Sequence, residues 1–93
     1  MHYVYLVRCA DNTLYCGWTT DLEKRVRAHN SGQGAKYTRS RRPVQLIYAE
    51  EYLEKHEALS REWHLKHMSR AEKLRLAETA CAGRQSRKSI KYR

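Results

Sequence analysis

Two short segments near the N-terminus have the composition of β-strands and are separated by turn-forming residues. Residues 3–7 (Tyr-Val-Tyr-Leu-Val) and 14–18 (Leu-Tyr-Cys-Gly-Trp) are rich in aromatic and β-branched side chains. Asp11-Asn12, a pair typical of turns, lies between them. The pattern predicts a β-hairpin at the start of the chain.

The length of the hairpin loop decides which side chains share a face of the sheet. A three-residue loop, Asp11-Asn12-Thr13, pairs Cys9 with Tyr15 and places Tyr5 and Tyr15 on one face. A two-residue loop places these tyrosines on opposite faces. The sequence leaves both arrangements open, because the usual loop glycine is missing and only Asn12 readily takes a left-handed conformation.

Helical periodicity and capping patterns predict three helices after the hairpin. Capping-box pairs Thr20/Glu23 and Ser69/Glu72 mark two of the helix starts. The expected helices span residues 21–31, 54–67 and 69–79, and a third strand spans residues 44–49. The prediction is an α/β (α+β) domain with a small three-stranded, mainly antiparallel sheet flanked by helices, in the order β-β-α-β-α-α.

The charge of the chain indicates a polyanionic partner. The formal net charge is +9 over 93 residues, a length that fits one domain. Residues 1–80 hold 14 Lys and Arg against 10 acids, whereas residues 81–93 hold five Lys and Arg and no acid. We therefore expect a folded domain over 1–80 and a basic, disordered tail over 81–93. Nucleic acid is the first expected partner and an anionic membrane the second.

Cysteine usage and hydropathy favour a soluble protein of the cytoplasm. Three cysteines without a C-x-x-C spacing argue against a disulfide framework and against a thiolate zinc site. No apolar run reaches the length of a membrane span.

Arg25 and His29 are expected to lie beside the buried stripe of the first helix. At about 100° per residue they share an arc with Leu22 and Val26. A guanidinium next to the core requires an anionic or polar partner. The partner could be a substrate, or Glu50 or Glu51 in a structural salt bridge.

A basic loop follows this helix. It runs over residues 31–42 and contains no acid. Cations interleaved with an aromatic suit a nucleic-acid backbone and base stacking, although a solvated loop has the same composition. The candidate nucleic-acid contacts are Lys36, Tyr37, Arg39, Arg41 and Arg42, together with Lys66 in the next helix.

Glu62 is the most informative carboxylate in the chain. It falls between two apolar lines of the helix over 54–67, namely Leu59–Trp63 and Ala58–Leu65. Trp63 of this helix and Trp18 of the hairpin are both expected in the core. An acid in this position needs a cation, because a buried unpaired charge is costly. The cation could be a metal ion, or Arg61, Lys66 or Arg25 in an ion pair.

Taken in order, these motifs resemble the GIY-YIG nuclease superfamily over about residues 2–79. The resemblance rests on Tyr3-Val4-Tyr5, Tyr15-Cys16-Gly17, Arg25 with His29, and Glu62. Tyr3 stands where the family name has Gly, and Cys16 where it has Ile. Many members also carry an Asn after the metal-binding Glu, and here no Asn occurs after Asn30, so Lys66 is the candidate to substitute in part.

The resemblance implies a metal-dependent DNA endonuclease, structure-selective and linked to DNA repair. Glu62 would hold one Mg²⁺ or Mn²⁺ ion and Arg25 the scissile phosphate. Tyr5 is the leading general base, with Tyr15 and His29 as rivals, and Gly17 would allow close approach of the substrate.

Several alternatives stay open. The chain could be a nucleic-acid-binding module with little or no catalysis, or an accessory protein on ribosomal RNA or an anionic membrane. DNA is favoured over RNA, and a protein partner or a homodimer is compatible with a domain of this size.

Overall fold

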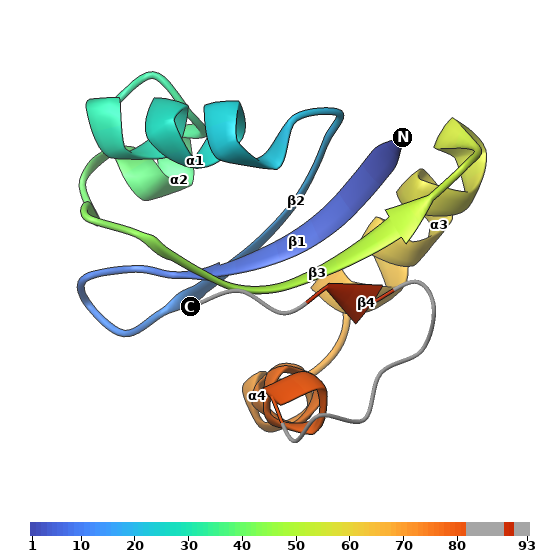
Figure 1. Cartoon of the computed structure of the whole chain (residues 1–93). Helices are drawn as coiled ribbons and strands as arrows, with labels where there is room; N and C mark the ends of the chain where they lie inside the picture. Colours follow the sequence, from blue (N-terminus) through green and yellow to red (C-terminus); the bar gives the residue numbers. More distant parts are fainter. Residues whose placement is uncertain (82–88, 91–93) are drawn as a thin grey trace.

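An antiparallel sheet of three longer strands and one two-residue strand forms the centre of the molecule, and helices cover both of its faces (Figure 1). The computed structural model describes residues 1–81 and 89–90. The elements in chain order are β1 (His2–Arg8), β2 (Leu14–Thr19), α1 (Leu22–Ser31), α2 (Lys36–Arg39), β3 (Gln45–Tyr52), α3 (Lys55–Lys66), α4 (Arg70–Cys81) and β4 (Ser89–Ile90). The predicted α+β class and element order are confirmed. The short helix α2, in the expected basic loop, and the two-residue strand β4 were not predicted.

The strand order is β2-β1-β3-β4, so β1 is central and β2 is an outer strand. β1 pairs antiparallel with both β2 and β3. β4 pairs antiparallel with β3 and belongs to the segment for which a disordered tail was expected. Apart from Cys81 and β4, that tail lies outside the described residues.

The hairpin between β1 and β2 has a three-residue loop that begins one residue earlier than expected. Tyr5 pairs with Gly17 and Val7 with Tyr15, so the expected pairing of Cys9 with Tyr15 is wrong by two residues. Because the shift is even, Tyr5 and Tyr15 still share a face of the sheet. The loop is residues 10–12, and Asn12 takes the left-handed position usually held by glycine, with φ of 69°.

The tip of this hairpin contacts helical segments on both sides of the sheet. Asp11 Oδ2 accepts a hydrogen bond from Arg41 Nε at 3.0 Å, just after α2, and the Ala10 amide donates to the Arg41 carbonyl at 2.8 Å. Arg70, the first residue of α4, donates to the Asn12 carbonyl. The tip therefore joins the segment after α2 to the start of α4.

Alternation along the strands separates two hydrophobic layers. One layer, on the α1 side, contains Tyr5, Val7, Cys9, Leu22, Val44, Leu46 and Ala49. The other, on the side of α3 and α4, contains Val4, Leu6, Cys16, Tyr48, Ala58, Leu65 and Ala77. Figure 1 shows α1 and α2 above the sheet and α4 below it. Side chains of β1 thus alternate between the two layers, as the period of two requires.

The helix caps agree only in part with the capping patterns. Glu72 and Ser69 form the expected reciprocal capping box at α4, with bonds of 2.9 and 3.2 Å. At α1 the N-cap is Asp21, whose carboxylate accepts from the Lys24 amide at 3.1 Å, so the expected Thr20 cap is wrong. Gly32 ends α1 with φ of 89°, a left-handed cap that suits glycine.

The predicted second apolar line of α3 is wrong. Ala58 and Leu65 are fully buried, but Leu59 is 39% exposed and Trp63 is 59% exposed. α3 packs one side against the sheet, so one line of apolar side chains is enough. Trp18, also expected in the core, packs against the core cluster and is half-buried.

A buried carboxylate links β3 to α3. Glu50 accepts hydrogen bonds from Arg61 Nε and Nη2 at 2.8 and 3.0 Å, from the Tyr52 hydroxyl at 2.6 Å, and from the Tyr48 hydroxyl. Burial by itself raises the pKa of Glu50, but the bonds from Arg61 and the two tyrosines outweigh it and hold the pKa below its ordinary value. The ion is therefore stabilised by four donors on one side of the sheet.

Replacement of Glu50 by alanine is expected to lower the free energy of unfolding by about 3 kcal/mol, because it leaves Arg61 and the tyrosine hydroxyls without their shared acceptor. Urea unfolding measures the loss. Glu50→Gln, which keeps the shape, is expected to lose less, and Glu57→Ala, an exposed acid of α3, to change stability by under about 0.5 kcal/mol. A loss below about 1 kcal/mol in Glu50→Ala contradicts this role.

Candidate active site

Tyr5 occupies the centre of the sheet and lies against the backbone of Gly17. Its side chain is fully buried. A Cβ atom on Gly17 would lie 2.4 Å from the Tyr5 hydroxyl oxygen and 2.5 Å from Cζ, far inside contact distance. Position 17 therefore requires glycine, because any side chain there would clash with the phenol of Tyr5. Tyr5 fills the space beside Gly17 through which the substrate was expected to approach.

A chain of hydrogen bonds runs from Arg25 through Tyr5 and His29 to Thr38. Arg25 Nε donates to the Tyr5 hydroxyl at 3.1 Å, which lies 2.9 Å from His29 Nε2. His29 Nδ1 lies 2.7 Å from Thr38 Oγ1, which donates to the Ala35 carbonyl at 3.0 Å. A carbonyl only accepts, so the Thr38 proton is used there and His29 Nδ1 must donate to Thr38. His29 Nε2 is then the acceptor for the Tyr5 proton.

Two residues of this site were missed by the sequence reasoning. Thr38, fully buried in α2, fixes the orientation of the His29 ring. Gly34 allows the chain to pass His29, because a Cβ there would lie 2.4 Å from His29 Nδ1. A glycine in a Ser/Gly loop gives only a weak signal, and Thr38 gives none, since a single threonine among cations matches no motif.

Burial sets the protonation states along the chain of hydrogen bonds. Burial raises the pKa of Tyr5 to about 12, although the hydrogen bond and charge of Arg25 act in the opposite direction. Burial and the charge of Arg25 lower the pKa of His29 to about 4. At neutral pH Tyr5 is a phenol and His29 a neutral imidazole. These states agree with the donor directions of the hydrogen bonds.

Arg25 also reaches a surface hollow. The hollow has a volume of about 430 Å³ and is lined by Thr19, Thr20, Asp21, Lys24, Arg25 and Ala28. The hydrogen bond to Tyr5 is the main cause that raises the pKa of Arg25. The alternative of a salt bridge from Arg25 to Glu50 or Glu51 is wrong, because Glu50 binds Arg61 and Glu51 accepts from Tyr3.

Tyr15 connects the buried group to α2. Its ring lies 6.5 Å from that of Tyr5 and 5.4 Å from that of His29, measured between centroids, and it stacks on Tyr37 at 5.7 Å. The Arg41 guanidinium lies 4.1 Å over the Tyr37 ring and also binds the Tyr37 carbonyl at 2.7 Å. Tyr37 and Arg41 are therefore engaged within the protein.

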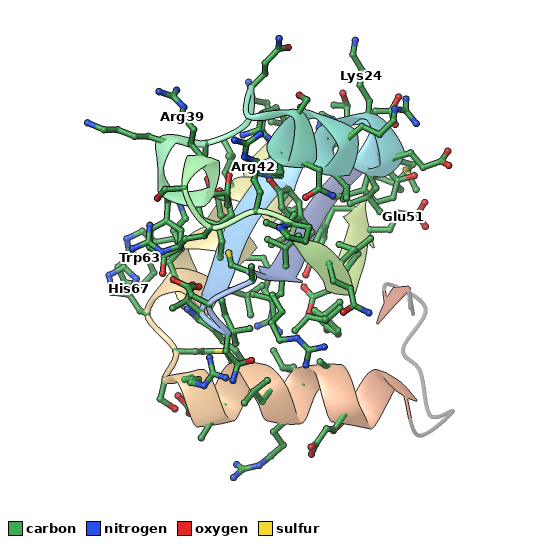
Figure 2. The ribbon with its side chains drawn as sticks, turned by 90° about the vertical axis from the view of Figure 1, so that its left-hand side faces the viewer. Lys24, Arg39, Arg42, Glu51, Trp63 and His67 are labelled. Carbon is green, nitrogen blue, oxygen red and sulfur yellow. The ribbon has the colours of Figure 1, made fainter. Side chains whose placement is uncertain are left out.

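The other predicted cations of this region lie at the surface. Lys36, Arg39 and Arg42 are exposed. Figure 2 shows Arg39 projecting outward at the left-hand edge. Arg42 Nε donates to the Arg39 carbonyl at 2.8 Å, so it is partly committed to holding α2 in place.

Glu62 lies across the outer strand from the tyrosine, arginine and histidine group. It belongs to α3, which covers the opposite face, and its carbonyl oxygen accepts from Cys16 Sγ at 3.9 Å. Burial first, and then the Glu62 charge, raise the pKa of Cys16 to about 12. Tyr15 and Cys16 are consecutive in β2 and point to opposite faces. The structure thus gathers Tyr5, Tyr15, Arg25 and His29, and places Glu62 on the far side of β2.

The observed cation partner of Glu62 is Lys66. The Lys66 Nζ atom lies 3.5 Å from Glu62 Oε2, one helical turn away, and 19% of the Glu62 side chain is exposed. Among residues 1–81 and 89–90 no three or more His, Cys, Asp or Glu gather as a metal site. A lone carboxylate fits one hard ion whose shell is completed by water and phosphate, whereas a closed zinc site needs more ligands.

Comparison with known proteins identifies the family. A sequence profile described as the GIY-YIG catalytic domain matches residues 1–75. The chain belongs to the GIY-YIG family. It is 53% identical to a UPF0213 protein of Staphylococcus haemolyticus (83% of this chain and 94% of the relative) and 56% identical to one of Haloquadratum walsbyi (83% and 86%).

Two solved structures support the same fold. The solution NMR structure of a UPF0213 protein from Bacillus halodurans has a TM-score of 0.54 and 44% identity, covering 83% of this chain and 82% of that chain. That of a protein from E. faecalis has a TM-score of 0.62 and 39% identity, covering 91% of both chains.

Membership of the GIY-YIG family indicates nuclease chemistry, a hydrolase reaction on nucleic acid. GIY-YIG nucleases generally use a divalent metal ion. In the part of this GIY-YIG protein that the structure describes, no helix has the length and apolar composition needed to cross a membrane.

The buried neutral state of His29 makes the stability of this GIY-YIG protein sensitive to acid. The folded-state pKa of about 4 lies below the ordinary 6.5, so the unfolded chain takes up the proton first as the pH falls. Stability is therefore lost between about pH 6.5 and pH 4. We expect the free energy of unfolding to be about 2 kcal/mol lower at pH 5 than at pH 8.

Urea unfolding at several pH values checks this expectation, with His29→Gln as the matched variant. That variant has no imidazole to titrate, so the His29 part of the pH dependence should disappear while the contribution of the carboxylates persists. Parallel pH profiles for the two proteins would show that His29 is not held neutral by the fold.

Proposed function

We propose that this protein is a metal-dependent endonuclease that hydrolyses phosphodiester bonds, with DNA favoured over RNA. The observation that carries the proposal is the directed chain of hydrogen bonds from Arg25 through Tyr5 to His29. It supplies a phosphate-binding cation, a phenol and an acceptor for the phenol's proton within the catalytic domain of a nuclease family. These are the groups that phosphodiester hydrolysis requires.

Arg25 is the proposed ligand of the scissile phosphate. Its Nε atom is held by Tyr5, which fixes the plane of the guanidinium. Arg25 lines the hollow, where a phosphate can accept two parallel hydrogen bonds from a guanidinium. A lysine offers no such fork, so the site requires arginine.

Tyr5 and His29 are proposed to move the proton as one unit. The attacking water gives a proton to the Tyr5 oxygen as Tyr5 passes its own proton to His29 Nε2, and the water oxygen forms a bond to phosphorus. The bond from phosphorus to the leaving oxygen then breaks, that oxygen takes a proton from a solvent water, and His29 returns its extra proton to solvent. Passing the proton onward avoids a free phenolate, which the raised pKa of Tyr5 disfavours. Tyr15, half-buried beside both rings, is the proposed positioner of the water.

Glu62 is the proposed ligand of one Mg²⁺ or Mn²⁺ ion, because it is the carboxylate among the proposed site residues. The bound ion would supply neutralisation of the charge that grows on the phosphoryl oxygens. Lys66, now paired with Glu62 at 3.5 Å, would be released to contact the nucleic acid or the leaving group.

The exposed cations favour recognition of shape over recognition of sequence. Lys36, Arg39 and Arg42 suit contacts to phosphates, which carry no sequence information directly. We propose a structure-selective activity in DNA repair or processing. We also propose that the protein acts in the reducing cytoplasm, a compartment in which free thiols such as those of Cys9 and Cys16 persist.

Substitution of the two central groups is expected to abolish cleavage while binding persists. Arg25→Ala and Glu62→Ala should each lower the cleavage rate by at least about 100-fold, since each removes charge stabilisation that is present only during the reaction. End-labelled hairpin, flap, fork, nicked and single-stranded DNA, incubated with Mg²⁺ or Mn²⁺, measures the rate. Binding in EDTA should stay within about threefold of wild type for both variants.

Matched variants control for charge. Arg27→Ala removes an exposed arginine of the same helix, and Glu57→Ala an exposed acid of α3, and both should cleave like wild type. If the protein binds DNA but cleaves it with neither metal ion, the endonuclease proposal is wrong and the protein is a nucleic-acid-binding module. Loss of binding on truncation after residue 80, with no effect of Arg25→Ala, would favour a charge-driven accessory protein instead.

Thr38 is proposed as a positioning residue that holds the His29 tautomer. Thr38→Val removes the acceptor of the Nδ1 proton, so we expect kcat to fall by about tenfold with KM unchanged. Steady-state cleavage kinetics measure the split. Thr38→Ser, which keeps the oxygen, should retain wild-type kcat. A valine variant with full kcat, or a serine variant as impaired as valine, contradicts the positioning role.

A further inference from the structure

An exposed tryptophan of α3 follows the proposed metal ligand in the chain. Trp63 follows Glu62 in the chain and is 59% exposed. Its indole stacks on the His67 ring, with centroids 4.0 Å apart and an interplanar angle of 30°. His64 lies perpendicular to the indole at 5.2 Å. A large aromatic surface is therefore open to solvent beside Glu62.

The Trp63 and His67 pair is held in place within the free protein. His67 Nδ1 lies 2.7 Å from the Trp63 carbonyl, which only accepts, so the nitrogen donates. The bond fixes the imidazole against one side of the indole. Binding of a ligand to the pair would therefore cost the two side chains little conformational freedom.

Charge around the pair favours a polyanion. From Trp63 to Arg70 the chain contains no acid and two cations, Lys66 and Arg70. In Figure 2, Trp63 and His67 project at the same left-hand edge as Arg39 of α2. Strand β2 contacts the helices on both faces of the sheet, because Tyr15 stacks on Tyr37 of α2 and Cys16 contacts Glu62 of α3.

We propose that the Trp63 and His67 pair is a stacking site for an unpaired nucleobase of the substrate. Nucleobases stack on tryptophan and histidine regardless of sequence, and Lys66 lies in the same turn to meet the adjoining phosphate. In a duplex the bases are paired and covered by their neighbours, so the site selects single-stranded segments such as flaps or forks. This inference rests on the proposed nuclease function and names its substrate class.

The apolar surface is small for a protein interface. Leu59, one turn before Trp63, is 39% exposed, and polar or charged residues surround both. Stable protein interfaces bury about 800 Å² on each partner around an apolar centre. An isolated stacked pair with cations beside it fits a base and a phosphate better.

Fluorescence of the full chain tests the proposal with the oligonucleotides dT8, dA8 and rU8 and a blunt-ended DNA duplex of two separate strands, all in EDTA. Single strands should quench wild-type emission, and Trp63→Ala should bind them about tenfold more weakly, by anisotropy of a labelled oligonucleotide. Trp63→Phe should recover most of the affinity, and Leu59→Ala should bind like wild type. Duplex binding should be equal in all four proteins, and the rU8 result tells RNA from DNA.

Equal affinity of Trp63→Ala and wild type for the single strands would overturn the inference. A lower sedimentation mass for both Trp63→Ala and Leu59→Ala than for wild type would also overturn it, because it would show that this surface contacts another protein chain. Cleavage of labelled flaps with Mn²⁺ separates the two proposals. If wild type binds through Trp63 but cuts nothing, the nuclease function fails and the stacking site stands. If Trp63→Ala cuts flaps at the wild-type rate, the stacking site fails alone.

Discussion

The hydrogen bond between Tyr5 and His29 is the interaction on which the candidate site depends. It joins the central strand to α1. Its direction is set at the far end of the chain of hydrogen bonds, where Thr38 donates its hydroxyl proton to the Ala35 carbonyl and so accepts from His29. Both side chains are fully buried, so the bond is shielded from bulk solvent in the free protein. Burial that keeps His29 neutral is also what makes it an acceptor. The same packing therefore orders the site and sets its protonation.

The outer strand β2 divides the candidate site into two halves. Tyr15 and Gly17 face the buried rings, while Cys16 between them faces α3 and Glu62. A substrate that contacts both Arg25 and Glu62 has to lie along this edge of the sheet. Base stacking at Trp63 would extend the contact along α3, whereas Lys36 and Arg39 lie on the α2 side. Each proposed role thus follows from the side of β2 on which a residue lies.

Much of the fold could be predicted because it is specified locally. The period of the strands, the glycine after α1 and the Ser69/Glu72 pair each act within a few residues. The register of the hairpin was wrong by two because the loop lacks glycine, and Asn12 fills the left-handed position one residue earlier than the predicted loop would place it. The exposure of Trp63 was missed because helical periodicity counts apolar residues without telling how many lines the sheet covers.

The clustering of the candidate residues was predicted better than its detailed geometry. Tyr5, Tyr15, Arg25 and His29 do gather on one face, as parity and helical spacing suggested. Thr38 and Gly34 could not be found, since their roles arise from packing against His29 and no local pattern records such a contact. The separation of Glu62 by β2 was likewise invisible, because it depends on which face each helix covers.

The tip of the β1–β2 hairpin constrains variation more than a surface turn usually does. Its three residues are held by Arg41 after α2 and by Arg70 at the start of α4, on the two opposite sides of the sheet. A two-residue turn would remove the hydrogen bonds from the tip to both helical layers. Insertions that other hairpins tolerate at their ends would here disturb segments more than 25 residues distant in the chain, with Arg41 itself 30 residues from Asp11.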